Sequence, residues 1–235
     1  MRLLTAFLLA SSVFGQSTNT WVATHAQQTS GVQSDTMFHV VNAVVGATHT
    51  FKVTGSAGMF ADLQVACFSG VKTTTPAYGG SGASNPNSAT AGTGIINGIA
   101  VNDLLVATLN YATTNTATVD SGLAFADQDP LNGGLSYGGA LAWKIAASTT
   151  SVTAVFTVGG ATTVNAVSSG FLTAGGTPGL VAHVKAHGNA TFTTAAINTT
   201  GANFCVANLS GSNTPGTLTD NVAVGGTIKH KVVSQ

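Results

Sequence analysis

The sequence contains no glutamate and has little charge of either sign. All seven acidic residues are aspartates, seven Lys and Arg balance them, and only 6% of the 235 residues are charged. A nucleic-acid surface needs concentrated cations to neutralise phosphates, and seven scattered ones do not supply it. Long surface helices rely on Glu, Lys and Arg. The composition therefore excludes a nucleic-acid binder and disfavours a helical protein.

Long hydrophobic runs are also missing. In residues 1–15 (MRLLTAFLLASSVFG), Arg2 precedes an apolar run at residues 3–14. Val13 and Gly15 occupy positions −3 and −1 of a cleavage site before Gln16. That is the pattern of a secretory signal peptide, and it is too short to span a bilayer. We expect a signal peptide cleaved before Gln16 and a secreted, extracellular protein with no membrane span. The alternative is a retained first strand.

Cysteine is scarce, with only Cys67 and Cys205 present. Both lie in apolar, strand-like runs (LQVACFSGV and ANFCVANL). An oxidising compartment permits one disulfide between them if their strands are neighbours. Otherwise they are two small buried hydrophobic residues, and the sequence leaves both readings open.

The sequence is rich in short apolar or alternating runs bounded by Gly, Asn, Asp, Ser or Pro, which tolerate turn geometry. No long window holds a helical period with caps. We therefore predict an all-β fold, an antiparallel β-sandwich or jelly roll with Greek-key connections. The expected strands are residues 36–41, 50–53, 63–68, 103–109, 135–145, 151–158, 163–172, 180–185, 202–209 and 226–233.

Two polar segments are expected to be loops. Residues 73–93 are dense in Gly, Ser, Asn and Pro and predict a long mobile excursion. Residues 174–179 (AGGTPG) predict a junction. The expected organisation is thus a β-sandwich body at 16–174 and C-terminal strands at 175–235, which complete the same sandwich or that of a neighbouring subunit.

Several stretches resemble a recurrent module: NTWVATHAQQTSG (19–31), TMFHVVNAVVGATHTFKVTG (36–55), LQVACFSGV (63–71) and VDSGLAFAD…YGGALAWKI (119–145). This is the jelly-roll, lectin-like β-sandwich found in secreted bacterial proteins and phage-associated surface proteins. In that module a segment like residues 193–221 precedes the NTW strand, whereas here it comes last. The resemblance implies a permuted strand order, and slightly favours a tail that docks on another chain.

Two functions fit this picture. A sheet that lacks strands has open edges that strand addition fills, and near-zero net charge removes repulsion between subunits. This favours a non-enzymatic structural subunit, in a filament, surface layer or virion surface, that forms homo-oligomers or polymers through its C-terminal strands. The alternative is a monomeric carbohydrate-binding or adhesion module, with Trp21 and Tyr78 as the glycan-binding candidates.

Enzymatic motifs are missing. Without glutamate the usual glycosidase carboxylate pair is absent, and neither a nucleophile elbow nor a zinc-protease or phosphate-loop motif occurs. An aspartate-based hydrolase is the remaining enzymatic alternative, and we expect no enzyme.

One segment has the composition of a metal site. Asp127, Asp129 and Asn132 bring two carboxylates and an amide into a Gly-ended stretch, which suits Ca²⁺. An Asx-rich turn needs the same residues, and no glutamate is present for bidentate closure. His183 and His187 lie four apart, but on a strand about 13 Å would separate them, which is too far for one metal. Calcium is therefore the one cofactor candidate.

Overall fold

The computed structural model describes residues 19–29, 33–55, 58, 60–80, 82–130, 137–212 and 216–221. The predicted signal peptide, Asn132 and the expected strand at 226–233 lie outside these residues. The described chain contains strands and no helices, so it offers no helix that could cross a membrane. All the pairings between its strands are antiparallel. The prediction of an all-β antiparallel fold is confirmed.

The strands are β1 (Val22–Thr29), β2 (Gln33–Val41), β3 (Phe51–Thr54), β4 (Phe60–Ser69), β5 (Ala77–Tyr78), β6 (Gly82–Gly92), β7 (Leu104–Tyr111), β8 (Thr118–Val119), β9 (Ala124–Asp129), β10 (Gly138–Ile145), β11 (Val155–Phe171), β12 (Gly179–Asn189), β13 (Thr191–Thr193), β14 (Phe204–Ser212) and β15 (Thr217–Asp220).

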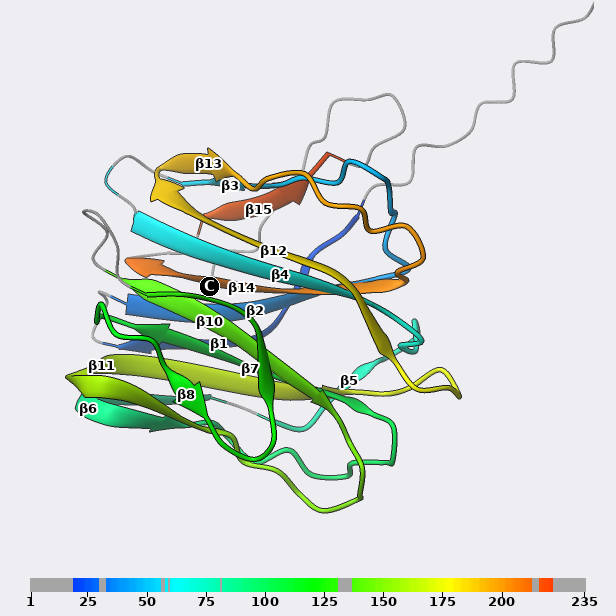
Figure 1. Cartoon of the computed structure of the whole chain (residues 1–235), viewed down its shortest axis with the longest axis horizontal. Coiled ribbons are helices and arrows are strands. Elements are labelled where there is room, and N and C mark those ends of the chain that lie inside the picture. Colours follow the sequence, from blue (N-terminus) through cyan, green and yellow to red (C-terminus); the bar gives the residue numbers. More distant parts are fainter. Residues whose placement is uncertain are drawn as a thin grey trace, which may run out of the picture.

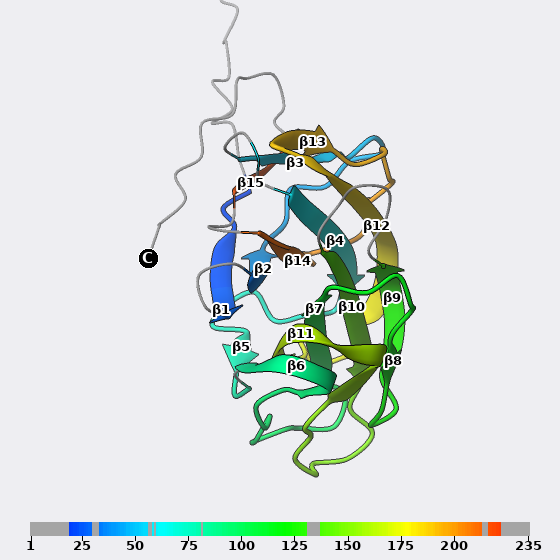
Figure 2. The same cartoon turned by 90° about the vertical axis from the view of Figure 1, so that its left-hand side faces the viewer.

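The strands form stacked sheets (Figures 1 and 2). The middle sheet has the order β1-β2-β14-β4-β12. It packs on a second sheet, which we call the lower sheet, with the order β5-β11-β7-β10-β9, and β6 and β8 join this sheet by pairing with β11. A small sheet, β13-β3-β15, covers the other face of the middle sheet. The middle sheet is therefore covered on both faces, which explains why its central strands are apolar on both.

Alternation along β14 shows how one strand serves two cores. Phe204 and Val206 join the apolar core between the middle and lower sheets. Cys205 and Leu209 point the other way, into the core beneath the small sheet. Successive side chains of a strand lie on opposite faces, so each face has its own apolar set.

Strand β11 replaces two of the expected strands. The runs at 151–158 and 163–172 were expected to be separate, but one strand spans Val155–Phe171. Its pairing with β6 is irregular between Thr157 and Thr162, and Gly160 within this stretch has a φ of 134°. A conformation open mainly to glycine thus bends the strand without ending it.

The predicted loop at 73–93 is wrong. Residues 82–92 form β6, which pairs with β11, and residues 77–78 form β5. Gly, Ser and Asn have low strand propensity, but backbone pairing to a long neighbour depends little on their side chains. Tertiary pairing therefore overrode the composition of this segment.

The tail strand β14 lies inside its own chain's sheet. It pairs with β2 on one side and β4 on the other, and Cys205 is directly opposite Cys67. These two cysteines form a disulfide across 138 residues of sequence. The structure thus differs from the slight preference for docking on another chain. Since β2 and β4 do not pair with each other, β14 fills the place between them.

Candidate functional site

Strands β9 and β12 face each other across one open side of the sandwich, and charged side chains bridge them. Asp127 on β9 meets His183 on β12, with Oδ2 and Nδ1 2.7 Å apart. Asp129 meets His187 in the same way at 2.6 Å. Between them, Lys185 donates to the Gln128 carbonyl at 2.6 Å and lies 3.7 Å from an Asp129 carboxylate oxygen. We call these five bridging residues of β9 and β12 the seam.

The two aspartates of the predicted calcium site are both part of the seam. Asp127 and Asp129 are directed at two different histidines, and Asn132 is outside the described residues. Within the part of the chain that the structure describes, no three His, Cys, Asp or Glu side chains group closely enough to hold a metal ion. The histidines lie on a strand, so their spacing serves two separate carboxylates.

A buried polar layer lies beside the seam, between the middle and lower sheets. Asp35, Ser210, Asp62 and His187 stand in one row across β2, β14, β4 and β12. Asp35, Asp62 and Ser210 are at most 1% exposed. Gly139 of β10 lies opposite, where a Cβ would come within 2.4 Å of the Ser210 Oγ. Only glycine lets the two sheets approach this closely.

Hydrogen bonds satisfy part of this layer. The Gln64 amide donates to Asp62 at 2.6 Å, and the Asn208 amide donates to Gln64 at 2.8 Å and to the Leu109 and Ala140 carbonyls. Thr108 donates to Asp35 at 3.0 Å. A buried amide that reaches both sheets stabilises their alignment.

Other polar atoms of the layer have no hydrogen-bond partner among the described residues. They include one carboxylate oxygen each of Asp35 and Asp62, the Ser210 hydroxyl and the Tyr111 hydroxyl. Burial raises the pKa of Asp62 well above its ordinary value, and the nearby Asp129 carboxylate adds to the rise. Burial likewise raises the pKa of Asp35. Both carboxyls are therefore held toward the neutral form.

This layer could be mistaken for aspartate-based hydrolytic chemistry. A general acid or base must come within hydrogen-bond reach of a substrate atom. Asp62 is 1% exposed and Asp35 fully buried, so a substrate cannot reach either one in this conformation. The layer aligns the two sheets.

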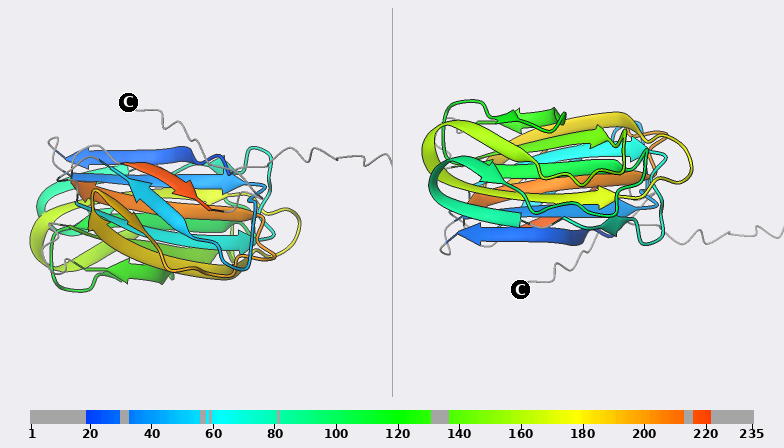
Figure 3. Two further views of the ribbon diagram at one scale, coloured as in Figure 1. Left: turned by 90° about the horizontal axis from the view of Figure 1, so that it is seen from above. Right: turned by 90° about the horizontal axis from the view of Figure 1, so that it is seen from below.

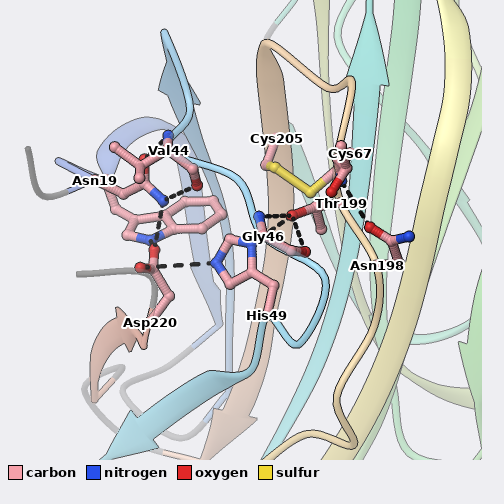
Figure 4. The surroundings of a disulfide bond; sticks show 11 residues. Asn19, Val44, Gly46, His49, Cys67, Asn198, Thr199, Cys205 and Asp220 are labelled. Atoms are coloured by element: carbon pink, nitrogen blue, oxygen red, sulfur yellow. Dashed lines mark hydrogen bonds and ion pairs between the residues drawn. A yellow bond between two sulfur atoms is a disulfide. The ribbon is translucent and has the colours of Figure 1, made fainter. Parts of the chain in front are cut away.

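Trp21, one of the two predicted glycan contacts, belongs to a network that joins the two ends of the described chain. Figure 4 shows its members Asn19, His49 and Asp220. The Trp21 indole donates to Asp220 at 3.1 Å, and the Asn19 amide donates to the same oxygen at 3.0 Å. His49 lies 3.7 Å from the other Asp220 oxygen, and its ring contacts Thr199 at 2.9 Å. We call this group the corner, because residues 19 and 220 meet here.

The corner has the residue types of a nucleophilic triad. Asp220, His49 and Thr199 stand in acid–base–hydroxyl order, as in a hydrolase. Yet Thr199 and His49 are fully buried, and the Thr199 hydroxyl is also hydrogen-bonded to the Gly46 backbone. A nucleophile needs access to its substrate, so this arrangement stabilises the fold.

Tyr78, the other predicted glycan contact, lies elsewhere. Its hydroxyl donates to Asp103 at 2.6 Å, and its ring packs on a separate cluster that contains Ile96. Burial raises the pKa of Tyr78, and the hydrogen bond to the Asp103 carboxylate and its charge raise it further. The structure therefore does not bring Trp21 and Tyr78 together as one stacking platform.

A shallow hollow of about 380 Å³ opens at the far end from the polar layer. Lys72 and Asn203 are among its lining residues. The Asn203 amide is already used by the Val71 backbone, with Nδ2 2.6 Å from the carbonyl oxygen. The hollow offers one exposed lysine and an asparagine whose amide is already hydrogen-bonded, which is a weak basis for ligand recognition.

The two edges of the middle sheet differ. Edge strand β12 contains Lys185 between His183 and His187, and all three side chains contact residues of β9 in the seam. Edge strand β1 has the sequence VATHAQQT, without Lys, Arg, Asp, Glu or Pro, and pairs only with β2 among the described strands. Figure 3 shows β1 at the outer margin of the sandwich. Among the residues that the structure describes, Val22 on β1 is one of three large apolar side chains that are about half exposed, at 49%.

Sequence reasoning missed most of these polar contacts. Asp62, Gln64 and Asn208 stand at alternate positions in otherwise apolar strands, which is a usable signal for a buried polar layer. The corner joins residues about 200 positions apart in the sequence, so no local sequence pattern predicts their contact.

Searches against protein-family models, curated proteins and solved structures returned no match to this chain. The residues and their geometry therefore carry the functional argument alone.

Proposed function

We propose that the protein is a non-enzymatic extracellular structural subunit that self-assembles by β-strand complementation, with residues 226–233 as the donated strand. The observation that carries this is the edge strand β1, which pairs only with β2 among the described strands and contains no charged residue other than a histidine and no proline. The tail strand β14 occupies the centre of its own sheet and is joined to β4 by the Cys67–Cys205 disulfide, so it is not free to be donated. Complementation between copies then falls to the part of the tail that follows β15.

The tail has the composition for this role. Residues 226–233 (GTIKHKVV) are rich in β-branched residues, which is typical of a strand, with a basic run at 229–231 between apolar positions. Strand addition gains affinity from main-chain hydrogen bonds and needs little from specific side chains.

The body supports a structural role. The carboxyls of the buried layer and the His49–Thr199 pair of the corner are buried, and the half-exposed seam histidines are each paired with an aspartate. The Cys67–Cys205 disulfide suits an oxidising compartment, as does the signal-like pattern at 1–15.

Light scattering on the chain from Gln16 onward tests the proposal. We expect oligomers or filaments from the full chain and a monomer from a chain ending at Asn221. Ile228→Pro should also give a monomer, because proline removes a ladder donor within the strand. Ser234→Pro, just beyond it, is the matched control and should still assemble. A full chain that stays monomeric across concentrations overturns the proposal, and glycan affinity in that monomer would favour the carbohydrate-binding alternative.

A further inference from the structure

We propose that the acceptor for this strand is the outer edge of β1 in a second copy of the chain. The inference rests on the proposed function and names the surface that it requires. Its occupant is residues 226–233 of the other copy.

The first argument is the chemistry of the edges. Strands that would pair wrongly are blunted by inward-pointing charges, especially lysine. β12 has this protection from Lys185, His183 and His187, each with a partner on β9. β1 has no formal charge at neutral pH apart from any on His25, and its exposed Val22 offers apolar surface at one end. A new strand meets a desolvation penalty at β12 that it does not meet at β1.

The second argument is where the described chain ends. Asp220 binds the side chains of Asn19 and Trp21, so the tail leaves the fold beside the start of β1 at Val22. The fourteen residues from 222 to 235 span roughly 45 Å when extended at about 3.3 Å per residue. Residues 226–233 number eight, as does β1.

The third argument is direction, and it selects a second copy over the chain's own tail. A tail that left the corner and ran along its own β1 would be parallel to it, because both start at the same corner. The sheet is antiparallel at its described pairings, β1 with β2 included. The tail of a second copy can arrive from the Thr29 end and pair antiparallel, the commoner and slightly more stable arrangement.

Charge does not oppose this pairing. The tail carries Lys229 and Lys231 and no acid, and β1 contains no lysine or arginine that would repel it. A β-bulge between Ala23 and His25 interrupts the pairing with β2, so the regular part of the edge is His25–Thr29.

Directed cross-linking tests the edge. One variant carries Ala23→Cys on β1, and its partner carries Ile228→Cys, His230→Cys or Val232→Cys in the tail. The native cysteines are already paired and buried, so they do not compete. Mixing the two variants under mild oxidation should give a covalent heterodimer with at least one tail position. Ala186→Cys on β12 is the matched acceptor control and should give none.

The outcomes separate the two proposals. If the full chain assembles but cross-links form only with Ala186→Cys, or with neither acceptor, the β1 assignment is wrong and strand complementation survives. If a chain carrying both Ala23→Cys and a tail cysteine cross-links within itself at high dilution, the acceptor is its own β1 and the second copy is ruled out. If the full chain never assembles, both proposals fail.

Discussion

The two edge strands of the middle sheet, β1 and β12, belong to one layer but are treated differently. β12 is eleven residues long, and its central Lys185 and flanking histidines bridge to Asp127 and Asp129 of β9. β1 is eight residues long and almost uncharged. The same kind of backbone edge thus carries a lysine and two histidines with partners at one end of the sheet, and neither Lys, Arg, Asp nor Glu at the other.

The contrast shows how a protein with 6% charged residues can still control its contacts. Only four lysines occur between residues 19 and 221, and one of them stands in the middle of the longer edge strand. Placing scarce charge there directs strand addition elsewhere, because an incoming strand would have to desolvate Lys185. Substitutions in the sheet that the two strands share, substitutions at each edge and changes of pH test this difference.

The largest expected effect comes from the disulfide at the centre of the sheet that carries both edges. Cys67→Ala with Cys205→Ala should lower the free energy of unfolding by about 2–5 kcal/mol, since a long closed loop is released in the unfolded chain. Urea denaturation of the chain ending at Asn221 measures this without assembly. An unchanged midpoint would mean that β14 holds its place without the cross-link.

Near β12, the free energy of unfolding should fall as the pH rises, because of Asp62 on the neighbouring strand β4. Asp62 has a raised pKa in the folded state, so its stabilisation is present below about pH 3.8 and is lost as the pH rises toward the folded pKa. Each unit of separation corresponds to about 1.4 kcal/mol. Asp62→Asn should flatten the decline in the free energy of unfolding above pH 4, leaving the share due to Asp35.

Thr114→Ala, at an exposed position between β7 and β8 and without a titratable group, is the control for this measurement. It should leave the slope of stability against pH nearly unchanged. If Asp62→Asn leaves the slope as steep as the parent's, the buried layer does not hold the proton that we assign to it.

Near β1, the free energy of unfolding should instead fall as the pH is lowered, because of His39 on the neighbouring strand β2. His39 on β2 pairs with Val22 of β1, and burial lowers the pKa of its imidazole. A lowered pKa gives stability that is present above about pH 6.5 and is lost as the pH falls through the folded value. His39→Gln should weaken the loss of stability between pH 6.5 and 5, measured by thermal unfolding, while His25→Gln serves as a control. A steeper loss in the His39 variant would contradict the assignment.

The smallest change in stability is expected at the seam. Asp127→Asn with Asp129→Asn should lower the free energy of unfolding by about 0.2–1 kcal/mol per pair, because half-exposed ion pairs contribute little. The histidines would then lose their carboxylate partners, whereas Lys185 would keep its hydrogen bond to the Gln128 carbonyl and stay on β12. Lys185→Thr should instead add a second assembling edge, seen as larger oligomers in light scattering. Unchanged oligomer size would mean that Lys185 does not guard β12.

The sequence indicates the fold class well and the polar contacts poorly. Alternation along residues 202–209 predicts a strand covered on both faces, and β14 is one, because side-chain period follows directly from backbone geometry. The 73–93 segment shows the reverse, since its strand β6 exists only through pairing with the distant β11. Local composition cannot report a neighbour that lies about 75 residues away.

The candidate sites divide along the same line. Composition alone marks Asp127 and Asp129 as a candidate oxygen-ligand cluster, but their partners His183 and His187 come from a strand more than 50 residues later. Trp21 was identified as an aromatic near the mature N-terminus, but its partner Asp220 lies 199 residues away. Residue type marks a position as unusual, and only the fold says what it contacts.

Hydrogen exchange resolved by residue tests the central claim, that β1 accepts a strand from another copy while β12 does not. In the assembled full chain, outward-facing amides between His25 and Thr29 should be protected, and they should lose that protection when the chain ends at Asn221. Amides along the outer side of β12 should exchange alike in both chains. Protection that appears on β12, or β1 amides that exchange equally in both chains, would contradict the account.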